Sequence, residues 1–211
     1  MTPDRETFHA ALVARHGLER QARFDAARVA VCGLGGLGSN VAIALARAGV
    51  GRLHLIDFDR VEPSNLNRQQ YFASQVGMTK ADALRENIAA INPYCEVVAE
   101  TLRIDPGKVR SLLAGDDIVC EAFDRAEAKA MLVSEVMEAF PDKPIVAASG
   151  MAGLESANRI ATKRVSRRLY LCGDFVADVN DGLGLYGARV LVCAAHQATM
   201  VLRLIAGETE A

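Results

Sequence analysis

Four glycines near the start of the chain have the spacing of a phosphate-binding turn. They are Gly33, Gly35, Gly36 and Gly38. They separate a valine-rich apolar run at 29–32 from an apolar helical pattern at 41–48, which predicts a strand, a tight turn and a helix. Glycine reaches backbone conformations that a Cβ forbids, and the N–H groups that open a helix attract anions. We therefore expect this glycine turn, residues 33–38, to hold the phosphates of a nucleotide.

A carboxylate follows the next apolar run, at the place where the ribose of that nucleotide would lie. Residues 52–56 predict a second strand, which Asp57 ends, and Asp59 comes shortly after it. An acid at this position accepts hydrogen bonds from both ribose hydroxyls and repels a 2′-phosphate, so the pattern disfavours NADP. The glycine spacing by itself fits a dinucleotide and a triphosphate equally well, and at this point both stay open.

The segment after Asp57 is dense in polar and basic side chains, which an ordinary dehydrogenase does not need there. It contains Asn65 and Arg68, and Lys80 follows at the expected start of a helix. With Thr79 as the N-cap, Lys80 occupies the first helical position, where a cation opposes the helix dipole at a cost of about 0.3–1 kcal/mol. A nearby anion explains a lysine there, and a solvated surface lysine is the alternative.

The rest of the chain alternates between strand and helix patterns. Strand patterns are found at 96–101, 117–123 and 143–150, with helical patterns between them. This order predicts an α/β fold, Rossmann-like and doubly wound, with a mainly parallel sheet covered on both faces. Ligands of such sheets lie beyond the carboxyl ends of the strands, so we expect the glycine turn, Asp57 and Asp124 along one edge.

Three finer expectations concern the later elements. A short helix is predicted over 105–113, and Asp124 is expected to cap the helix that follows it, with Glu127 at the capping-box position. The runs at 157–163 and 168–171 predict antiparallel strands toward the C-terminus. An apolar helix is expected to close the chain.

Length and composition limit the possible classes of protein. At 211 residues with 51% apolar content, a single domain over residues 1–211 is the economical reading. The net charge of −2 and a pI near 6.1 argue against a nucleic-acid footprint over the whole surface. We identify no apolar run of the ~18–20 residues that span a bilayer, and no secretory signal at the start. We therefore expect a cytoplasmic protein that does not bind membranes.

Cysteine and histidine spacing predicts no metal site. The chain has five cysteines, an odd number, and no Cys-x-x-Cys pair, which makes a disulfide framework or a four-thiolate zinc site improbable. Cys32, Cys120 and Cys193 lie in apolar patterns typical of buried side chains. Cys172 lies between a predicted strand and a loop, a position that allows exposure to solvent, although a reactive role is not the favoured reading.

Together these motifs resemble one family. The glycine turn, Asp57 with Asp59, the segment 64–69, Lys80 and Asp124 are similar to the motifs of the ThiF and MoeB family, the bacterial relatives of ubiquitin-activating enzymes. Segments 171–174 and 193–197 resemble the short ThiF-like branch associated with thiamine biosynthesis. The resemblance implies ATP-dependent adenylation of the C-terminal glycine of a ubiquitin-like sulfur carrier that ends in Gly-Gly, and a homodimeric enzyme.

The resemblance also implies roles for individual residues. The glycine turn would hold phosphates, Asp57 would take the ribose, and Asp59 would belong to the same nucleotide site. The remaining roles are phosphate contacts from Asn65 and Arg68, stabilisation of the transferring α-phosphate by Lys80, and binding of Mg²⁺ by Asp124.

The chain departs from the family pattern in three places. The Cys-x-x-Cys zinc staple of longer members is missing, so no zinc is expected. The N-terminal arginine that reaches the neighbouring subunit in dimeric members has no clean match, and Arg15 or Arg20 are the candidates. Cys172 is the candidate for a thioester-forming cysteine, and the reaction can also stop at the acyl-adenylate.

Other functions remain open beside the adenylyltransferase. An NAD-dependent oxidoreductase accounts for the glycines and Asp57 but gives Arg68, Lys80 and Asp124 no task. A non-catalytic module that binds the carrier needs none of the charged site residues. Within the family, a dehydratase acting on modified tRNA adenosine is possible, although the short chain lacks a broad basic surface.

Overall fold

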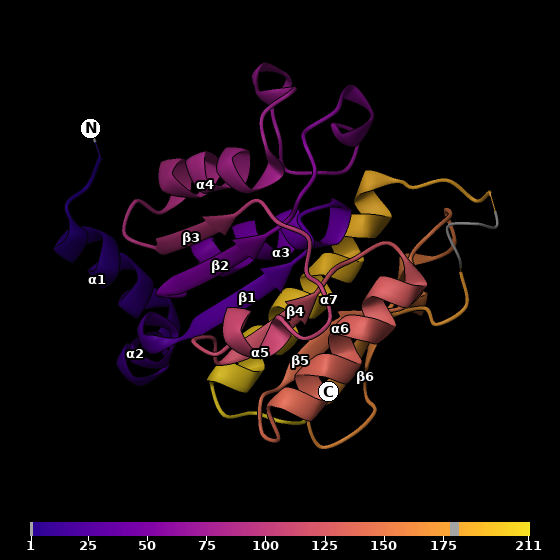
Figure 1. The fold of residues 1–211 in the computed structure, drawn as a ribbon. Coiled ribbons are helices and arrows are strands. Elements are labelled where there is room, and N and C mark those ends of the chain that lie inside the picture. The colour runs from indigo at the N-terminus through magenta and orange to yellow at the C-terminus, as the bar shows by residue number, and fades with distance from the viewer. Residues whose placement is uncertain (1, 178–181) are drawn as a thin grey trace.

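The computed structural model describes residues 2–177 and 182–211, and Figure 1 shows a central sheet with helices on both of its faces. The sheet has seven strands in the order β3-β2-β1-β4-β5-β7-β6. Their bounds are β1 (Arg28–Cys32), β2 (Arg52–Ile56), β3 (Glu96–Glu100), β4 (Ile118–Glu121), β5 (Ile145–Ala148), β6 (Ala161–Arg164) and β7 (Leu169–Gly173). All neighbouring pairs are parallel except β6 with β7. The Rossmann-like, mainly parallel fold is confirmed, and its antiparallel part is the single pair at the C-terminal edge.

The helices complete two layers around the sheet. They are α1 (Arg5–His16), α2 (Leu18–Ala26), α3 (Gly36–Arg47), α4 (Lys80–Ile91), α5 (Val109–Leu112), α6 (Ala126–Ala139) and α7 (Gly187–Ile205). One core cluster joins β1 and β2 to α3, α4 and α7, and a second joins the other face of the sheet to α5 and α6. Alternate residues of β1 enter different clusters, with Val29 in the first and Ala30 in the second. A strand covered on both sides reads as a continuous apolar run, which is what the sequence shows.

The strand register brings three strand ends to one level. Cys32 pairs with Ile56 of β2 on one side and with Glu121 of β4 on the other. These are the last residues of β1, β2 and β4. The segments that begin at Gly33, Asp57 and Ala122 therefore leave the sheet at the same edge, as the α/β topology predicts.

Several local expectations differ from the structure. The helix expected over 105–113 is reduced to Val109–Leu112, and residues 157–159 form a 3₁₀ turn, so β6 begins only at Ala161. Gly17, with φ +82°, ends α1, and the second helix α2 follows it directly. The N-cap of α6 is Arg125 in an extended conformation without a side-chain cap, so Asp124 does not cap that helix.

The closing helix α7 is apolar, as expected. It has 19 residues and a mean hydropathy of 1.3 over an 18-residue window, so by length and composition it could cross a membrane, contrary to the expectation that no segment of the chain could. In the structure 44% of that window is buried inside the protein. Its buried side includes Val190, Cys193 and Val201, which pack in the same cluster as α3.

Candidate functional site

The glycine turn folds as the sequence predicts, and two of its positions accept only glycine. Gly33 has φ +90°, and a Cβ there would lie 2.8 Å from the Ala122 carbonyl oxygen. A Cβ on Gly38 would lie 1.8 Å from the Gly33 carbonyl oxygen, so helix and strand could not stay together. Helix α3 starts after Gly35 without a side-chain cap. The N–H groups of its first turn therefore remain available to an anion.

Asp57 is tied to the glycine turn through the backbone. Its Oδ2 accepts a hydrogen bond from Leu34 N at 2.6 Å, and its Oδ1 accepts one from Asp59 N at 2.8 Å. Each oxygen keeps a further lone pair for another donor. The Tyr71 hydroxyl donates to the Leu34 carbonyl at 2.7 Å from the other side. Sequence analysis did not identify this contact of Tyr71. Burial raises the pKa of its hydroxyl, which stays protonated and can donate.

Lys80 is buried at the same edge. Thr79 caps α4 by accepting from Asp82 N at 3.3 Å, so Lys80 is the first helical residue, as predicted. The Lys80 side chain is 8% exposed, and its Nζ lies 2.9 Å from Asp59 Oδ2. A solvated surface lysine is therefore wrong for this position. Because Asp59 N donates to Asp57, the lysine, Asp59, Asp57 and the glycine turn form one connected set.

Arg68 lies beside the start of α3. Asn40 of that helix donates from Nδ2 to the Arg68 carbonyl at 3.0 Å, and a Cβ on Gly36 would lie 3.5 Å from Arg68 Cγ. Arg68 as a whole is half-buried, and its guanidinium makes two exposed hydrogen bonds, donating to the Ser64 carbonyl at 3.0 Å and to Asn67 Oδ1 at 2.8 Å. The structure thus brings Arg68 to the glycine turn.

Asn65 has a local task in the same loop. Its Oδ1 accepts from Glu62 N at 3.1 Å, which closes the 3₁₀ turn Pro63–Asn65, and the side chain is buried. This amide oxygen holds the shape of the loop that carries Arg68.

Asp124 follows β4 on the segment that touches the glycine turn. The adjoining Phe123 lies close to Gly33, since a Cβ on Gly33 would be 2.9 Å from its ring. Asp124 itself is exposed. A free carboxylate is the kind of oxygen ligand that Mg²⁺ takes, together with phosphate oxygens and water. Within residues 2–177 and 182–211 no group of three or more His, Cys, Asp or Glu side chains is placed to hold a metal, so phosphate oxygens would have to complete such a site.

A glutamate and a lysine that the sequence analysis did not single out lie beneath Asp124. Glu121, the last residue of β4, is fully buried, and Lys129 of α6 lies 2.9 Å from its Oε2. From the opposite side, Gln197 of α7 donates to the Glu121 carbonyl at 3.0 Å, while Val190 of α7 lies against Gly36. Burial raises the pKa of Glu121, and the charge of Lys129 opposes that rise.

A cavity of about 320 Å³ lies next to Asp57, at the carboxyl end of β3. Its lining residues are Glu100, Leu102, Arg103, Ile104, Lys108, Ser111 and Leu112. Asp57 N donates to the Glu100 carbonyl at 3.2 Å, which joins the cavity to the strand-end carboxylate. Beside it, the Arg103 guanidinium lies 4.9 Å from the centre of the Phe58 ring.

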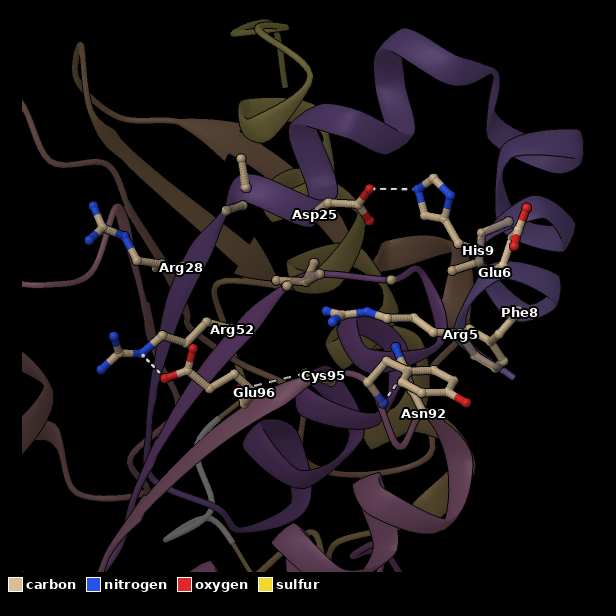
Figure 2. A pocket seen from close by; sticks show the side chains of 17 residues that line it. Arg5, Glu6, Phe8, His9, Asp25, Arg28, Arg52, Asn92, Cys95 and Glu96 are labelled. Carbon is tan, nitrogen blue, oxygen red and sulfur yellow. Dashed lines mark hydrogen bonds and ion pairs between the residues drawn. The ribbon is translucent and has the colours of Figure 1, made fainter. Parts of the chain in front are cut away.

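A larger cavity of about 700 Å³ lies at the opposite edge of the sheet and is shown in Figure 2. It is lined by α1 and by Arg28, Arg52 and Glu96, the first residues of β1, β2 and β3. Two pairs form among its lining side chains, His9 with Asp25 at 2.8 Å and Arg52 with Glu96 at 3.6 Å. None of the predicted site residues lines it. The larger cavity therefore lies at the amino ends of β1, β2 and β3, away from the predicted site at their carboxyl ends.

Cys172 and the two candidate arginines lie away from the glycine turn within one subunit. Cys172 is fully buried, and burial raises its pKa to about 11, although the Thr162 hydroxyl partly opposes the shift. Of the two alternatives that the sequence left open for Cys172, the structure shows the buried one. Arg15 and Arg20 belong to α1 and α2, which lead into the amino end of β1, so within one subunit they lie at the edge opposite the glycine turn.

Comparison with known proteins agrees with these motifs. The model of the ThiF family matches residues 9–211. The chain belongs to the ThiF family. A molybdopterin-synthase adenylyltransferase of Salmonella typhimurium is 34% identical over 73% of the chain, and a tRNA threonylcarbamoyladenosine dehydratase of Bacillus subtilis is 36% identical over 74%. These matches cover 61% and 60% of the two relatives, so the chain spans less than two thirds of their length.

The ThiF fold extends over nearly the whole chain. A crystal structure of the E. coli tRNA N6-threonylcarbamoyladenosine dehydratase TcdA in complex with ATP superposes with a TM-score of 0.86. That match covers 98% of both chains at 23% sequence identity. At this identity the likeness concerns the fold.

Proposed function

We propose that this ThiF-family chain adenylates the C-terminal glycine of a small ubiquitin-like sulfur carrier, consuming ATP and releasing pyrophosphate. The observation that carries the proposal is the joining of four features at the ends of β1, β2 and β4. Three of them suit the phosphates and their metal, namely the uncapped helix start behind the glycine turn, the buried Lys80 ammonium and the exposed Asp124 carboxylate, and the fourth is the Asp57 carboxylate, which suits the ribose. A dinucleotide needs the helix start and Asp57 alone.

ATP fits this edge in one orientation. Its phosphates lie at the start of α3, and the ribose hydroxyls donate to the free lone pairs of Asp57. The base then occupies the 320 Å³ cavity beside Glu100, which opens next to Asp57. Phe58 and Arg103 supply flat surfaces near that cavity.

The chemistry needs charge stabilisation more than proton transfer. The carrier's terminal carboxylate is already ionised at pH 7, so it attacks the α-phosphorus without a general base. A new P–O bond forms to the carrier, the bond to the β-phosphate breaks, and pyrophosphate carries away the electron pair. Lys80 and Arg68 balance the negative charge that accumulates on the α-phosphate oxygens. Bound Mg²⁺ would add further positive charge beside the triphosphate, with Asp124 as its protein ligand.

The surface beside Arg68 suits a polypeptide substrate. Leu183 and Tyr186 are both exposed, and the loop that carries them is joined to the site where Asn67 Nδ2 donates to the Leu185 carbonyl at 3.1 Å. Leu154 is exposed nearby, since Gly153 N donates to the Gly184 carbonyl at 2.9 Å. Exposed apolar side chains at the mouth of a site commonly contact a protein partner.

The experiment is a direct search for the adenylated product. The chain is incubated with Mg-ATP and a recombinant ThiS-like carrier that ends in Gly-Gly, and the intact carrier is weighed by mass spectrometry. A mass increase of one AMP, with carrier-dependent exchange of pyrophosphate into ATP, supports the proposal. A carrier of unchanged mass under conditions in which the chain binds ATP contradicts it.

The identity of the carrier belongs to the same proposal. We assign it to the ThiS class of thiamine biosynthesis, because segments 171–174 and 193–197 resemble the short ThiF-like branch. A MoaD-like carrier in parallel reactions is the comparison. A preference for the MoaD-like protein would overturn the thiamine assignment and leave the adenylation chemistry intact.

A dehydratase acting on modified tRNA adenosine is the second candidate. It is favoured by the Bacillus subtilis relative and by the TcdA fold, which covers nearly the whole chain. Loss of water from a carboxylate requires that an oxygen be made a leaving group, and adenylation does this, so the same residues would serve this reaction. Incubation with threonylcarbamoyladenosine-modified tRNA and Mg-ATP, followed by nucleoside analysis, separates the two functions. An NAD-dependent oxidoreductase is tested beside them by nicotinamide fluorescence.

The homodimer, the cytoplasmic location, the single domain and the lack of zinc remain predictions. Light scattering on the purified chain tests the first. If the dimer forms, Arg15→Ala and Arg20→Ala test whether either arginine acts in the neighbouring subunit.

A further inference from the structure

The turn that carries Asp124 is held by an ion pair buried below it. Lys129 Nζ donates to Glu121 Oε1 at 3.0 Å, to Glu121 Oε2 at 2.9 Å and to the Phe123 carbonyl at 2.7 Å. Phe123 N in turn donates to Glu121 Oε1 at 2.7 Å. All three protons of the ammonium are used, and both backbone polar groups of Phe123, the residue before Asp124, are fixed.

The same turn is locked against the glycine turn. Ala122 N donates to the Cys32 carbonyl at 2.9 Å, and Gly33 lies so close to the Ala122 carbonyl that a Cβ would be 2.8 Å from it. The ion pair, the Asp124 turn and the phosphate-binding segment therefore form one rigid unit. A change of geometry at Glu121 or Lys129 is transmitted to Asp124 through a single residue.

The stability of the fold does not by itself explain why an ion pair of Glu121 and Lys129 lies here. Glu121 is 1% exposed and Lys129 24%, and removing charges this deeply from water costs about as much as their attraction returns. An apolar pair of similar volume would hold β4 against α6 at least as well. What an apolar pair lacks is the set of directed bonds that fix both backbone groups of Phe123.

We propose that Glu121 and Lys129 are positioning residues that hold the Asp124 carboxylate in place to bind the divalent cation of the metal–nucleotide complex. The proposal rests on the proposed function for the role of Asp124. It predicts that loss of the pair weakens metal binding in the presence of nucleotide and leaves nucleotide binding without metal nearly unchanged.

The test measures binding separately from turnover. Binding of Mn²⁺ in the presence of α,β-methylene-ATP is followed by calorimetry for Lys129→Met, Glu121→Gln and Lys129→Arg in the full chain. We expect the first two to weaken Mn²⁺ binding about 10-fold or more, as loss of outer-shell support commonly does. The affinity for nucleotide without metal should stay within about 2-fold of the wild-type value. Lys129→Arg should retain most of the Mn²⁺ affinity, because arginine keeps a positive charge and hydrogen-bond donors at this position.

A double-mutant cycle distinguishes a specific effect on the position of Asp124 from a nonspecific loss of structure around the site. In the Asp124→Asn background, Lys129→Met should cause little further loss of Mn²⁺ affinity, because the ligand that it positions is gone. Arg28→Met is the matched control, because it breaks the pair with Asp117 at 2.9 Å at the other end of β4. It should leave metal binding unchanged.

Several results would overturn the proposal. The proposal is refuted if Lys129→Met folds and binds Mn²⁺ in the presence of nucleotide as tightly as the wild type does. It is also refuted if Lys129→Met weakens Mn²⁺ binding and metal-free nucleotide binding by the same factor. Fully additive effects of Lys129→Met and Asp124→Asn would do the same. If Lys129→Met fails to fold, Glu121→Gln and Lys129→Arg decide by the same measurements. Because these are binding experiments, they stand even if no carrier is adenylated, which would refute the proposed function alone.

Discussion

Replacing Lys80 with methionine tests the assigned charge stabilisation most directly. Methionine keeps most of the apolar stem and removes the ammonium that lies 2.9 Å from Asp59 Oδ2. Asp59 is 48% exposed, so water can solvate its carboxylate once the lysine is gone. The lost pair should therefore cost about 1 kcal/mol of unfolding free energy, or about 2–4 °C in Tm for a chain of this size.

The effect on turnover should be far larger than the effect on stability. A fixed cation that faces the charge developing in a transition state is worth about 3–4 kcal/mol, which is about 10²- to 10³-fold in rate. ATP affinity should fall by about 10-fold or less, because the glycine turn and Asp57 remain in place. Carrier-dependent pyrophosphate exchange measures the first quantity, and calorimetry with ATP measures the second.

A matched variant on the same helix gives the control. Arg85→Met breaks the exposed pair with Asp82 at 2.8 Å and should leave exchange unchanged. Turnover of Lys80→Met within about 5-fold of the wild type would refute the role of Lys80. A parallel loss of ATP binding and turnover would instead assign the lysine to ground-state binding.

Three further predictions concern single positions. Gly38→Ala should abolish ATP binding and lower Tm by several degrees, because the new Cβ would lie 1.8 Å from the Gly33 carbonyl oxygen. Gly35→Ala is the control: its Cβ would meet only Gln69 Nε2 at 3.8 Å, and the thermal melt should show an unchanged Tm. Cys172→Ala should retain adenylation. Burial raises the pKa of Cys172 to about 11, so mass spectrometry should show that iodoacetamide at pH 7.5 leaves the wild-type cysteine unalkylated. Rapid labelling would argue against the buried position. Burial lowers the pKa of His54, but Asp116 at 2.9 Å and Glu100 at 3.2 Å outweigh it and raise the pKa above its usual value. The stability that this gives is complete below about pH 6.5 and lost as pH rises through the raised pKa, so urea unfolding from pH 5.5 to 9 should show a decline that His54→Gln lacks.

Features set by neighbouring residues could be predicted from the sequence. The glycine turn follows from the steric freedom of glycine, and the position of Lys80 follows from the N-cap at Thr79, which involves residues only three apart. The parallel sheet follows from the alternation of strands and helices, and the common edge for Gly33, Asp57 and Asp124 follows from that topology. These parts of the structure need no knowledge of distant contacts.

Features set by distant packing could not be predicted in this way. Cys172 precedes a loop, which suggested exposure, but α7 covers it, and the Sγ of Cys193 from that helix donates to the Cys172 carbonyl at 3.6 Å. The pair of Glu121 and Lys129 depends on how α6 lies over β4. The sequence contains one indication of this pair, because Glu121 lies inside an otherwise apolar run and a buried carboxylate needs a partner. Asp124 looked like a helix cap because the sequence does not reveal that Arg125 takes the extended N-cap conformation.

The position of α7 links the site to the order of synthesis. Val190 closes one side of Gly36, and Gln197 supports the end of β4 from below, although both come late in the chain. A polypeptide still attached to the ribosome, with these residues in the exit tunnel, has the glycine turn, Arg68 and Lys80 outside but lacks the two α7 side chains that pack beside the proposed nucleotide site. That site is therefore complete only after α7 has emerged and packed against α3 and β4.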